Sequence, residues 1–242
     1  MIYHLDTTTS TNDDARDPKY RHGDIVWAEH QTAGRGQRGH KWLSPEGENL
    51  TFTMVVEPHF LPVAEQFLLC EALSVALTDT FAAYGIATRI KWTNDIYAGD
   101  RKLEGVLIEH NYSGTTLSRS LLGIGINVNQ TEFDPTLPNP VSMAQLTRRR
   151  YDRREVLDTF ERCMLARYEQ LEHGDREALQ RDYRERMYAL GEMRPFRYPD
   201  GTLTRGVIEG VHPSGELILR HEDGSLGEYL FKEIEFVIPE KG

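Results

Sequence analysis

Cysteine is scarce in this chain, and long hydrophobic runs are missing from it. The 242 residues include two cysteines, Cys70 and Cys163, which lie far apart within helical patterns. We therefore expect two buried thiols of a reduced cytoplasm, and neither a disulfide framework nor a cysteine metal site. No apolar run reaches the roughly 20 residues of a membrane-spanning helix, and the N-terminus lacks the apolar core of a secretory signal. The sequence predicts a cytoplasmic protein without a membrane partner.

Positive charge is also in deficit. The chain has 28 lysine and arginine residues against 38 aspartate and glutamate residues, which gives a net charge of −10 at pH 7. A dedicated nucleic-acid-binding protein needs a broad basic face to neutralise phosphates. The first predicted strand starts at Ile2, so we also expect no DNA-binding module ahead of it. The predicted partners therefore include no nucleic acid.

The patterns that are present predict an α+β protein with one sizeable core and a smaller second domain. Apolar and β-branched runs predict strands over residues 2–5, 25–30, 50–57, 88–92, 103–110 and 119–128. Helical periodicity predicts helices over residues 62–84, 152–171 and 176–188, and Ser142-x-x-Gln145 fits a capping box. Beyond Gly191, short apolar runs alternate with turn signals such as Asp223-Gly224, which is typical of a small all-β domain. We place the domains at residues 1–188 and 189–242.

Residues 31–42, QTAGRGQRGHKW, concentrate glycine and positive charge and end on a tryptophan. Glycine allows close backbone approach to a ligand, and arginine presents donors that match carboxylate or phosphate oxygens. The segment predicts a clamp for an anionic ligand with a flat ring; a solvated, charged turn is the alternative. It also fits the dinucleotide-binding pattern G-x-G-x-x-G, but that pattern requires a following helix, and residues 40–49 contain Pro45 and Gly47 without helical period.

Other polar residues gather at the ends of predicted strands. Several charged and amide side chains beside buried strands indicate a site rather than a core. These residues are Lys91, Asn94, Asp95 and Lys102. Gly123 and Gly125 interrupt the strand over residues 119–128, which indicates either close approach of a ligand or of another backbone segment, or a bulge. Ser10-Thr11-Asn12 fits a helix N-cap or a set of ligand contacts equally well.

Four strings stand in order along the chain: GRGQRGHKW (34–42), KWTNDIY (91–97), KLEGVLIE (102–109) and GIGINVN (123–129). Together with residues 10–12 and Gln31, they resemble the motif set of biotin–protein ligases, the biotin–acetyl-CoA-carboxylase ligase family. The resemblance implies a mixed-sheet catalytic domain related to class II tRNA synthetases, followed by a small SH3-like β-barrel. It implies the ligase-only type, without the N-terminal DNA-binding domain of members that repress transcription.

The resemblance also implies a reaction, its cofactors and its partner. Biotin and ATP form biotinyl-5′-AMP with the help of Mg²⁺, and the biotinyl group then passes to a lysine of a biotin carboxyl carrier protein. Lys102 and Arg35 would neutralise the biotin carboxylate and the α-phosphate, and Asp95 would hold Mg²⁺ or deprotonate the incoming lysine. We expect residues 34–42 to be mobile without ligand and to become ordered on binding.

The remaining residues of the motif set fall into two groups by the ligand that they would contact. The biotin group comprises Ser10, Thr11, Asn12, Gln31, Gly34, Arg35, Lys102 and Gly105. The nucleotide group comprises Arg38, Gly39, Trp42, Lys91, Asn94 and Asn127. Within these groups, Ser10, Thr11 and Gln31 would bind the ureido ring, Gly105 would accommodate the biotin tail, and Trp42 would close over the adenylate.

Four positions depart from the family pattern. Thr93 replaces a usual proline and Glu104 a usual small residue, and we expect both to alter only packing. Gln37 and His40 replace frequent arginines, which removes positive charge from the clamp. A lipoate–protein ligase and a non-catalytic biotin- or nucleotide-binding regulator are the alternative functions. A monomer or a homodimer is expected, with residues 106–110 or 121–126 as strand edges that could pair between chains.

Overall fold

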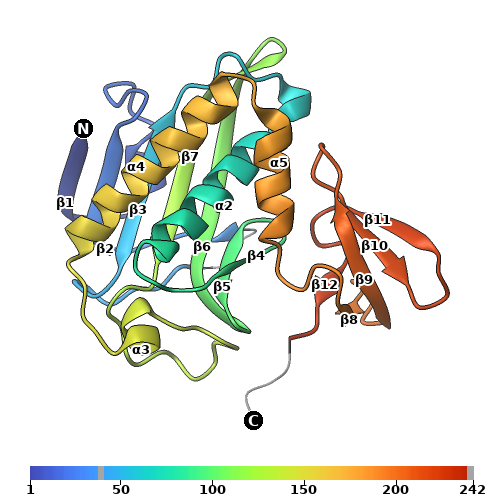
Figure 1. Ribbon diagram of the computed structural model, residues 1–242. Coiled ribbons are helices and arrows are strands. Elements are labelled where there is room, and N and C mark those ends of the chain that lie inside the picture. Colours follow the sequence, from blue (N-terminus) through green and yellow to red (C-terminus); the bar gives the residue numbers. More distant parts are fainter. Residues whose placement is uncertain (38–40, 239–242) are drawn as a thin grey trace.

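The computed structural model describes residues 1–37 and 41–238. Its larger sheet has seven strands in the order β1-β2-β3-β7-β6-β5-β4, in which β1 and β2 are parallel and the other neighbours antiparallel (Figure 1). The strands are β1 (Ile2–Thr8), β2 (Ile25–Gln31), β3 (Leu50–Val56), β4 (Arg89–Lys91), β5 (Asp95–Ala98), β6 (Arg101–Ser113) and β7 (Thr116–Ile126). Each strand predicted in this part of the chain is present.

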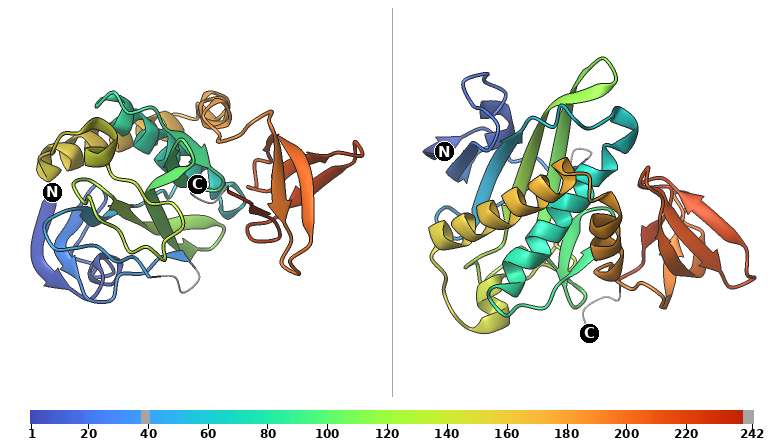
Figure 2. Two further views of the ribbon diagram at one scale, coloured as in Figure 1. Left: turned by 90° about the horizontal axis from the view of Figure 1, so that it is seen from below. Right: turned by 45° about the horizontal axis from the view of Figure 1, so that its top comes forward.

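The long helices cover one face of this sheet. They are α2 (Phe67–Ala82), preceded by the 3₁₀ turn η2 (Val63–Glu65), α4 (Arg153–Glu172) and α5 (Arg176–Glu185). Figure 2 shows α2 running between α4 and α5 on this face. Nearly every residue of α2 is buried. The helix therefore buries more of its surface than the single apolar stripe in its sequence predicts.

The large sheet is also accompanied by two short helices. The first, α1 (Thr11–Asp14), follows β1, and the second, α3 (Met143–Thr147), follows β7. Helix α3 starts with the predicted capping box: the Ser142 hydroxyl accepts a hydrogen bond from the Gln145 amide at 3.1 Å, and the Gln145 side chain accepts one from the Ser142 amide at 3.2 Å. The box satisfies two amides that the first helical turn leaves unpaired.

The C-terminal segment forms a second sheet of five antiparallel strands in the order β11-β10-β9-β8-β12. These are β8 (Met193–Arg197), β9 (Leu203–Val211), β10 (Leu217–His221), β11 (Leu226–Tyr229) and β12 (Glu235–Phe236). The sheet lies beside α5 and the β4 edge (Figure 1). The Trp92 indole donates a hydrogen bond to the Gly215 carbonyl at 2.9 Å and so links the two parts. The α+β class with a C-terminal β unit is confirmed.

Two smaller expectations need correction. Cys70 is buried, and burial raises the pKa of its thiol to about 12, but Cys163 is only half-buried. Strand β7 pairs with β3 and β6 on its two sides, so residues 121–126 offer no free edge. Within the described chain, β6 beyond Glu104 pairs with β7 alone. No helix of the described chain is long and apolar enough to cross a membrane.

Candidate active site

In the large sheet, Phe52 packs against Phe160 of α4, so its neighbours Thr51 and Thr53 point to the face away from the long helices. A cleft of about 910 Å³ opens on that face. Strand register explains its floor, because Gly125 lies between Thr51 of β3 and Gly105 of β6, and Gly123 lies between Thr53 and Leu107. Directly paired residues point to the same face of a sheet, so glycines occupy the centre of that face. Because glycine has no side chain, space remains above these strands for other groups.

Side chains from distant segments fill the space above these glycines. A Cβ atom on Gly125 would lie 2.3 Å from Cε2 of Trp42, and one on Gly105 would lie 3.1 Å from Cζ3 of the same indole. A Cβ atom on Gly123 would lie 2.3 Å from Oδ1 of Asn12. The β6–β7 and β3–β7 pairings continue without a register shift at these glycines, so close approach explains them and a bulge does not.

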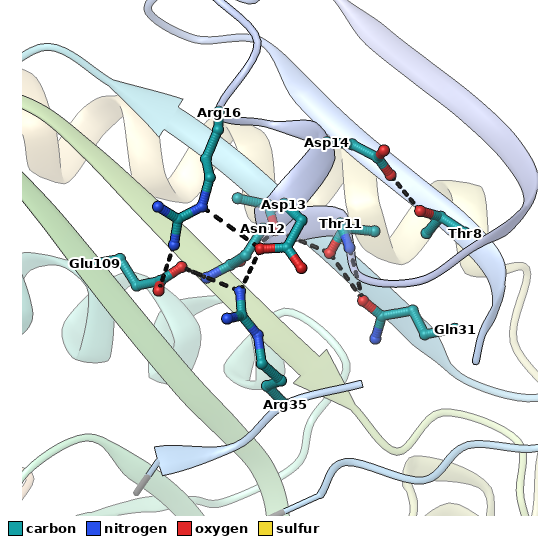
Figure 3. Close-up of polar contacts among 10 residues, drawn as sticks. Thr8, Thr11, Asn12, Asp13, Asp14, Arg16, Gln31, Arg35 and Glu109 are labelled. Atoms are coloured by element: carbon teal, nitrogen blue, oxygen red, sulfur yellow. Dashed lines mark hydrogen bonds and ion pairs between the residues drawn. The ribbon is translucent and has the colours of Figure 1, made fainter. Parts of the chain in front are cut away.

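One end of the cleft is built by α1 and the end of β2. Ser10 starts α1 without a side-chain capping bond, so its hydroxyl is not used by the helix. The Oε1 atom of Gln31 accepts hydrogen bonds from the Thr11 amide at 2.8 Å and from the Thr11 hydroxyl at 3.2 Å (Figure 3). This arrangement leaves the side-chain NH₂ group of Gln31 as a donor, and both Gln31 and Ser10 line the cleft.

Arg35 lines the same cleft and is surrounded by acidic side chains. Its guanidinium donates a hydrogen bond to Asp13 at 2.7 Å and lies 3.6 Å from Glu109 (Figure 3). Arg16 contacts both carboxylates, at 3.4 Å from Asp13 and 2.8 Å from Glu109. The positive charge of Arg35 is therefore balanced in this conformation.

Lys102 and Asp95 form the other charged pair of the cleft. The Lys102 ammonium lies 2.8 Å from an Asp95 oxygen, and both side chains are partly exposed to the cleft. Among the described residues, no three His, Cys, Asp or Glu side chains gather in a metal-binding group. Mg²⁺ that is held by one or two carboxylates and by substrate phosphates needs no such group. Asp95 therefore fits the family's metal.

Lys91 occupies a different position from the one its charge suggests. Its ammonium lies over the rings of Tyr97 and Phe236, at 5.4 and 5.2 Å from their centroids. Burial lowers the pKa of Lys91, while the nearby carboxylate of Asp95 acts in the opposite direction. Lys91 is not among the described residues that line the cleft, although its strand partner Asp95 is.

The remaining predicted residues are distributed around the cleft. Asn127 lines it and donates a hydrogen bond to the Val141 carbonyl at 3.1 Å. Asn94 is buried and accepts a hydrogen bond from Gln37 at 3.0 Å, and Gly34 packs against the Trp42 carbonyl. Neither Asn94 nor Gly34 is among the described residues that line the cleft. Arg38, Gly39 and His40 lie outside the described residues.

Glu104, which we expected to alter only packing, is a buried acidic residue close to the Lys102–Asp95 pair. It is fully buried, and neither carboxylate oxygen has a hydrogen-bond partner within the described chain. Burial raises the pKa of Glu104 well above its ordinary value, and the negative charge of Asp95 adds to the shift. The Glu104 carboxyl group lies close to the charged pair, because Glu104 is two residues from Lys102 on β6 and pairs with Ile96, the residue after Asp95.

Several cleft residues have no counterpart in the sequence-based assignment. They come from the segment after β7 and from the C-terminal sheet: Gln130, Phe133, Asp134, Thr136, Leu137, Asn139, Phe231, Lys232 and Glu235. The sequence offered one signal that this loop contributes to a site: apolar Phe133 and Leu137 within a polar, proline-containing segment. The contribution of residues 231–235 depends on how the second sheet packs, which no local pattern reveals.

Comparison with known proteins agrees with this geometry. The model of the Biotin/lipoate A/B protein ligase family matches residues 2–127. The biotin–[acetyl-CoA-carboxylase] ligase of Paracoccus denitrificans is 33% identical over 207 residues, which cover 82% of this chain and 85% of that protein. The bifunctional ligase/repressor BirA of Bacillus subtilis is 33% identical over 181 residues, and this chain spans 55% of its length.

The fold is shared over almost the whole chain. The structure of biotin protein ligase from Aquifex aeolicus in complex with biotin and ATP matches with a TM-score of 0.81 and 26% identity, and covers 98% of this chain and 99% of that chain. The resemblance that the four sequence strings indicate is thus confirmed. This chain belongs to the biotin/lipoate A/B protein ligase family.

Proposed function

We propose that this protein is an ATP-dependent biotin–protein ligase that modifies a lysine of a biotin carboxyl carrier protein in the cytoplasm. One observation carries the proposal: a single cleft holds a hydrogen-bonding end, built by Ser10, Thr11 and Gln31, and a cationic pair, Arg35 and Lys102. Biotin has the complementary form, with a polar ureido ring at one end and a carboxylate at the other. The similarity to a ligase bound to biotin and ATP supports the same conclusion.

The first half-reaction joins two anions. A carboxylate oxygen of biotin attacks the α-phosphorus of ATP, and the bond from that phosphorus to pyrophosphate breaks. Positive groups that are already in place stabilise the charge that develops in the transition state. Lys102 is suited to contact the biotin carboxylate and the α-phosphate, with Arg35 neutralising the same region.

Both cations are paired with carboxylates before substrate binds. Lys102 contacts Asp95 at 2.8 Å and Arg35 contacts Asp13 at 2.7 Å. The entering anions exchange with these partners, so the cleft keeps its positive groups ordered without leaving them unpaired. Mg²⁺ at Asp95 would supply further neutralisation of the triphosphate when it is bound.

The second half-reaction transfers the acyl group. The lysine amine attacks the carbonyl carbon of the mixed anhydride, AMP leaves with the bridging oxygen, and the amine loses a proton. Asp95 can accept that proton if it is not occupied by the metal. Water must be kept out because it hydrolyses the anhydride, and Trp42 is placed to cover the cleft floor.

The other assignments form part of the same proposal. On the family resemblance, we assign Asn12, Gly34 and Gly105 to the biotin subsite and Arg38, Gly39, Trp42, Lys91, Asn94 and Asn127 to the nucleotide subsite. Of these residues, Asn12, Gly105, Trp42 and Asn127 line the cleft. We propose a catalytic unit over residues 1–188 and a β unit over residues 189–242, and a monomer or a homodimer that acts without nucleic acid. The lining residues Phe231, Lys232 and Glu235 support a contribution of the β unit to the cleft.

The decisive experiment combines ATP, Mg²⁺ and labelled biotin with and without a carrier domain. We expect label on the carrier with the native protein and a loss of about 10²–10³ in rate for Lys102→Ala, the usual effect of one preorganised donor. Lys19→Ala is the matched control, because Lys19 is an exposed lysine paired with Asp17 at 3.4 Å. Pyrophosphate release with lipoate instead of biotin would identify a lipoate ligase, and binding without transfer would identify a regulator.

A further inference from the structure

Four side chains form a charged cluster beside the cleft. The mechanism above assigns a role to one of them, Arg35, and none to the other three. Arg16 and Arg35 alternate with Asp13 and Glu109, so that two positive and two negative groups meet (Figure 3). The cluster joins α1, the segment after β2, and β6. It therefore lies where the predicted biotin end and the predicted cationic pair of the cleft adjoin.

Glu109 is the residue at which this cluster meets the rest of the site. One of its oxygens accepts a hydrogen bond from Arg16 at 2.8 Å. The other accepts a hydrogen bond from the Asn12 side chain at 2.8 Å and lies 3.6 Å from the Arg35 guanidinium. The hydrogen bonds from Arg16 and Asn12 both involve the charged carboxylate of Glu109, and such bonds are shorter and stronger than those between neutral groups. Glu109 itself lies on β6, a long strand that is paired with β7 at this position.

A chain of buried hydrogen bonds extends from Glu109 to the ureido end of the cleft. The Thr53 hydroxyl lies 2.5 Å from Oδ1 of Asn12 and 2.8 Å from the Thr11 hydroxyl. Thr11 in turn holds Gln31 through its amide at 2.8 Å. The positions of these side chains are therefore coupled, because each buried polar group needs the next as its partner.

Asp13 is a weaker anchor for Arg35 than its distance suggests. The side chains of Asp13 and Arg16 are 46% and 54% exposed, and that of Glu109 is 29% exposed. Ion pairs between exposed side chains contribute little and are screened by salt. Asp13 also belongs to a four-residue helix, whereas Glu109 is attached to the sheet. The sheet therefore gives Glu109 a more fixed position beside the guanidinium than the short helix gives Asp13.

We propose that Glu109 is a positioning residue that holds Arg35 and Asn12 in register across the cleft. The proposal rests on the proposed function, since it concerns how accurately Arg35 meets the biotin carboxylate and the α-phosphate. The carboxylate does not touch either substrate. It acts through Arg35, and its loss displaces a group that has to be placed accurately for the first half-reaction.

The test measures biotin-dependent pyrophosphate release by Glu109→Gln, Arg35→Ala and the double variant. Glutamine keeps the shape of Glu109 and removes its charge. We expect kcat to fall at least about tenfold with a smaller change in KM for biotin, because misplacement of about 1 Å can cost 10²-fold. In the Arg35→Ala background the second change should have no further effect, since the two residues act as one unit.

Glu57→Gln is the matched control. Its carboxylate has nearly the same exposure, 27%, and also faces an arginine, Arg119 at 4.0 Å, but Arg119, unlike Arg35, is not among the described residues that line the cleft. We expect its kcat to be unchanged. Thermal melting of each variant verifies folding. If Glu109→Gln does not fold, Glu109→Asp replaces it. Aspartate keeps the charge but withdraws the carboxylate by one methylene, and we expect a smaller fall in kcat with the same non-additivity.

The outcomes distinguish a failure of the proposed role of Arg35 from a failure of the positioning role of Glu109. If Arg35→Ala retains full activity, the proposed role of Arg35 is wrong. If Arg35→Ala is impaired and Glu109→Gln is not, the positioning role is wrong while the function stands. An additive loss in the double variant would show a general structural role, and a rise in kcat for Glu109→Gln would show that Glu109 restrains Arg35; both outcomes overturn the inference.

Discussion

Replacing Glu71 with glutamine should remove a pH-dependent cost from the folded protein. Glu71 lies on α2 and is only 3% exposed, and its Oε2 atom has no hydrogen-bond partner among the described residues. It borders a second cleft, of about 460 Å³, between α5 and residues 211–213. Burial raises the pKa of Glu71 from 4.5 to about 8. The folded protein therefore binds this proton more tightly than the unfolded chain does.

The sign and the size of the effect follow from this difference. Stability falls as pH rises from the unfolded pKa of 4.5 to the folded pKa of about 8, because the unfolded chain releases the proton first. At about 1.4 kcal/mol per pH unit, the complete cost approaches about 5 kcal/mol. Between about pH 5.5 and about pH 8.5 the native protein should lose about 3 kcal/mol through this residue alone.

Urea denaturation of both proteins at these two pH values measures the effect. Glutamine introduces a buried amide with its own cost, but that cost is independent of pH and cancels from the comparison. We expect the stability of Glu71→Gln relative to the native protein to increase by about 3 kcal/mol from the lower to the higher pH. Glu169→Gln, an exposed site on α4, is the control. Parallel pH dependences of the native protein and Glu71→Gln would refute the reasoning.

Three further predictions address the cleft and the fold. Gly125→Ala places a methyl group 2.3 Å from the Trp42 indole, so tryptophan fluorescence should change and KM for biotin should rise; unchanged spectra would contradict this. Gln31→Ala removes a donor from the ureido end, and calorimetry should show biotin binding weakened by about tenfold; equal affinity would exclude that contact. Ser142→Ala removes the α3 cap and should lower the unfolding free energy by about 1 kcal/mol in urea titrations.

Local patterns were sufficient for most of the secondary structure. The strands that precede and follow the glycine-rich segment, the helix that contains Cys70 and the capping box at Ser142 all lie where periodicity and capping rules place them. These features depend on residues within one or two turns of each other. For the same reason the absence of a helix after residue 40 argued against a dinucleotide-binding loop, and the chain continues without one to β3.

Partners that are distant in the chain could not be inferred in this way. Gly125 required a close neighbour, but its glycine character did not identify Trp42 as that neighbour. Arg35 and Lys102 were recognisable as cations, but their pairing with Asp13 and Asp95 was not. The sequence shows which residues are positively charged, but only the folded sheet and its loops determine which carboxylate each of them pairs with.

The sequence by itself determined the family, the α+β class and the residue types from which a site for an anion and a polar ring is built, because these are properties of short strings and their spacing. Tertiary structure alone decided that Lys91 lies against aromatic rings, that Glu109 anchors the charged cluster, and that residues 231–235 reach the cleft. Burial and charge pairing are set by atoms from many parts of the chain at once, and only the packed fold specifies which of them meet.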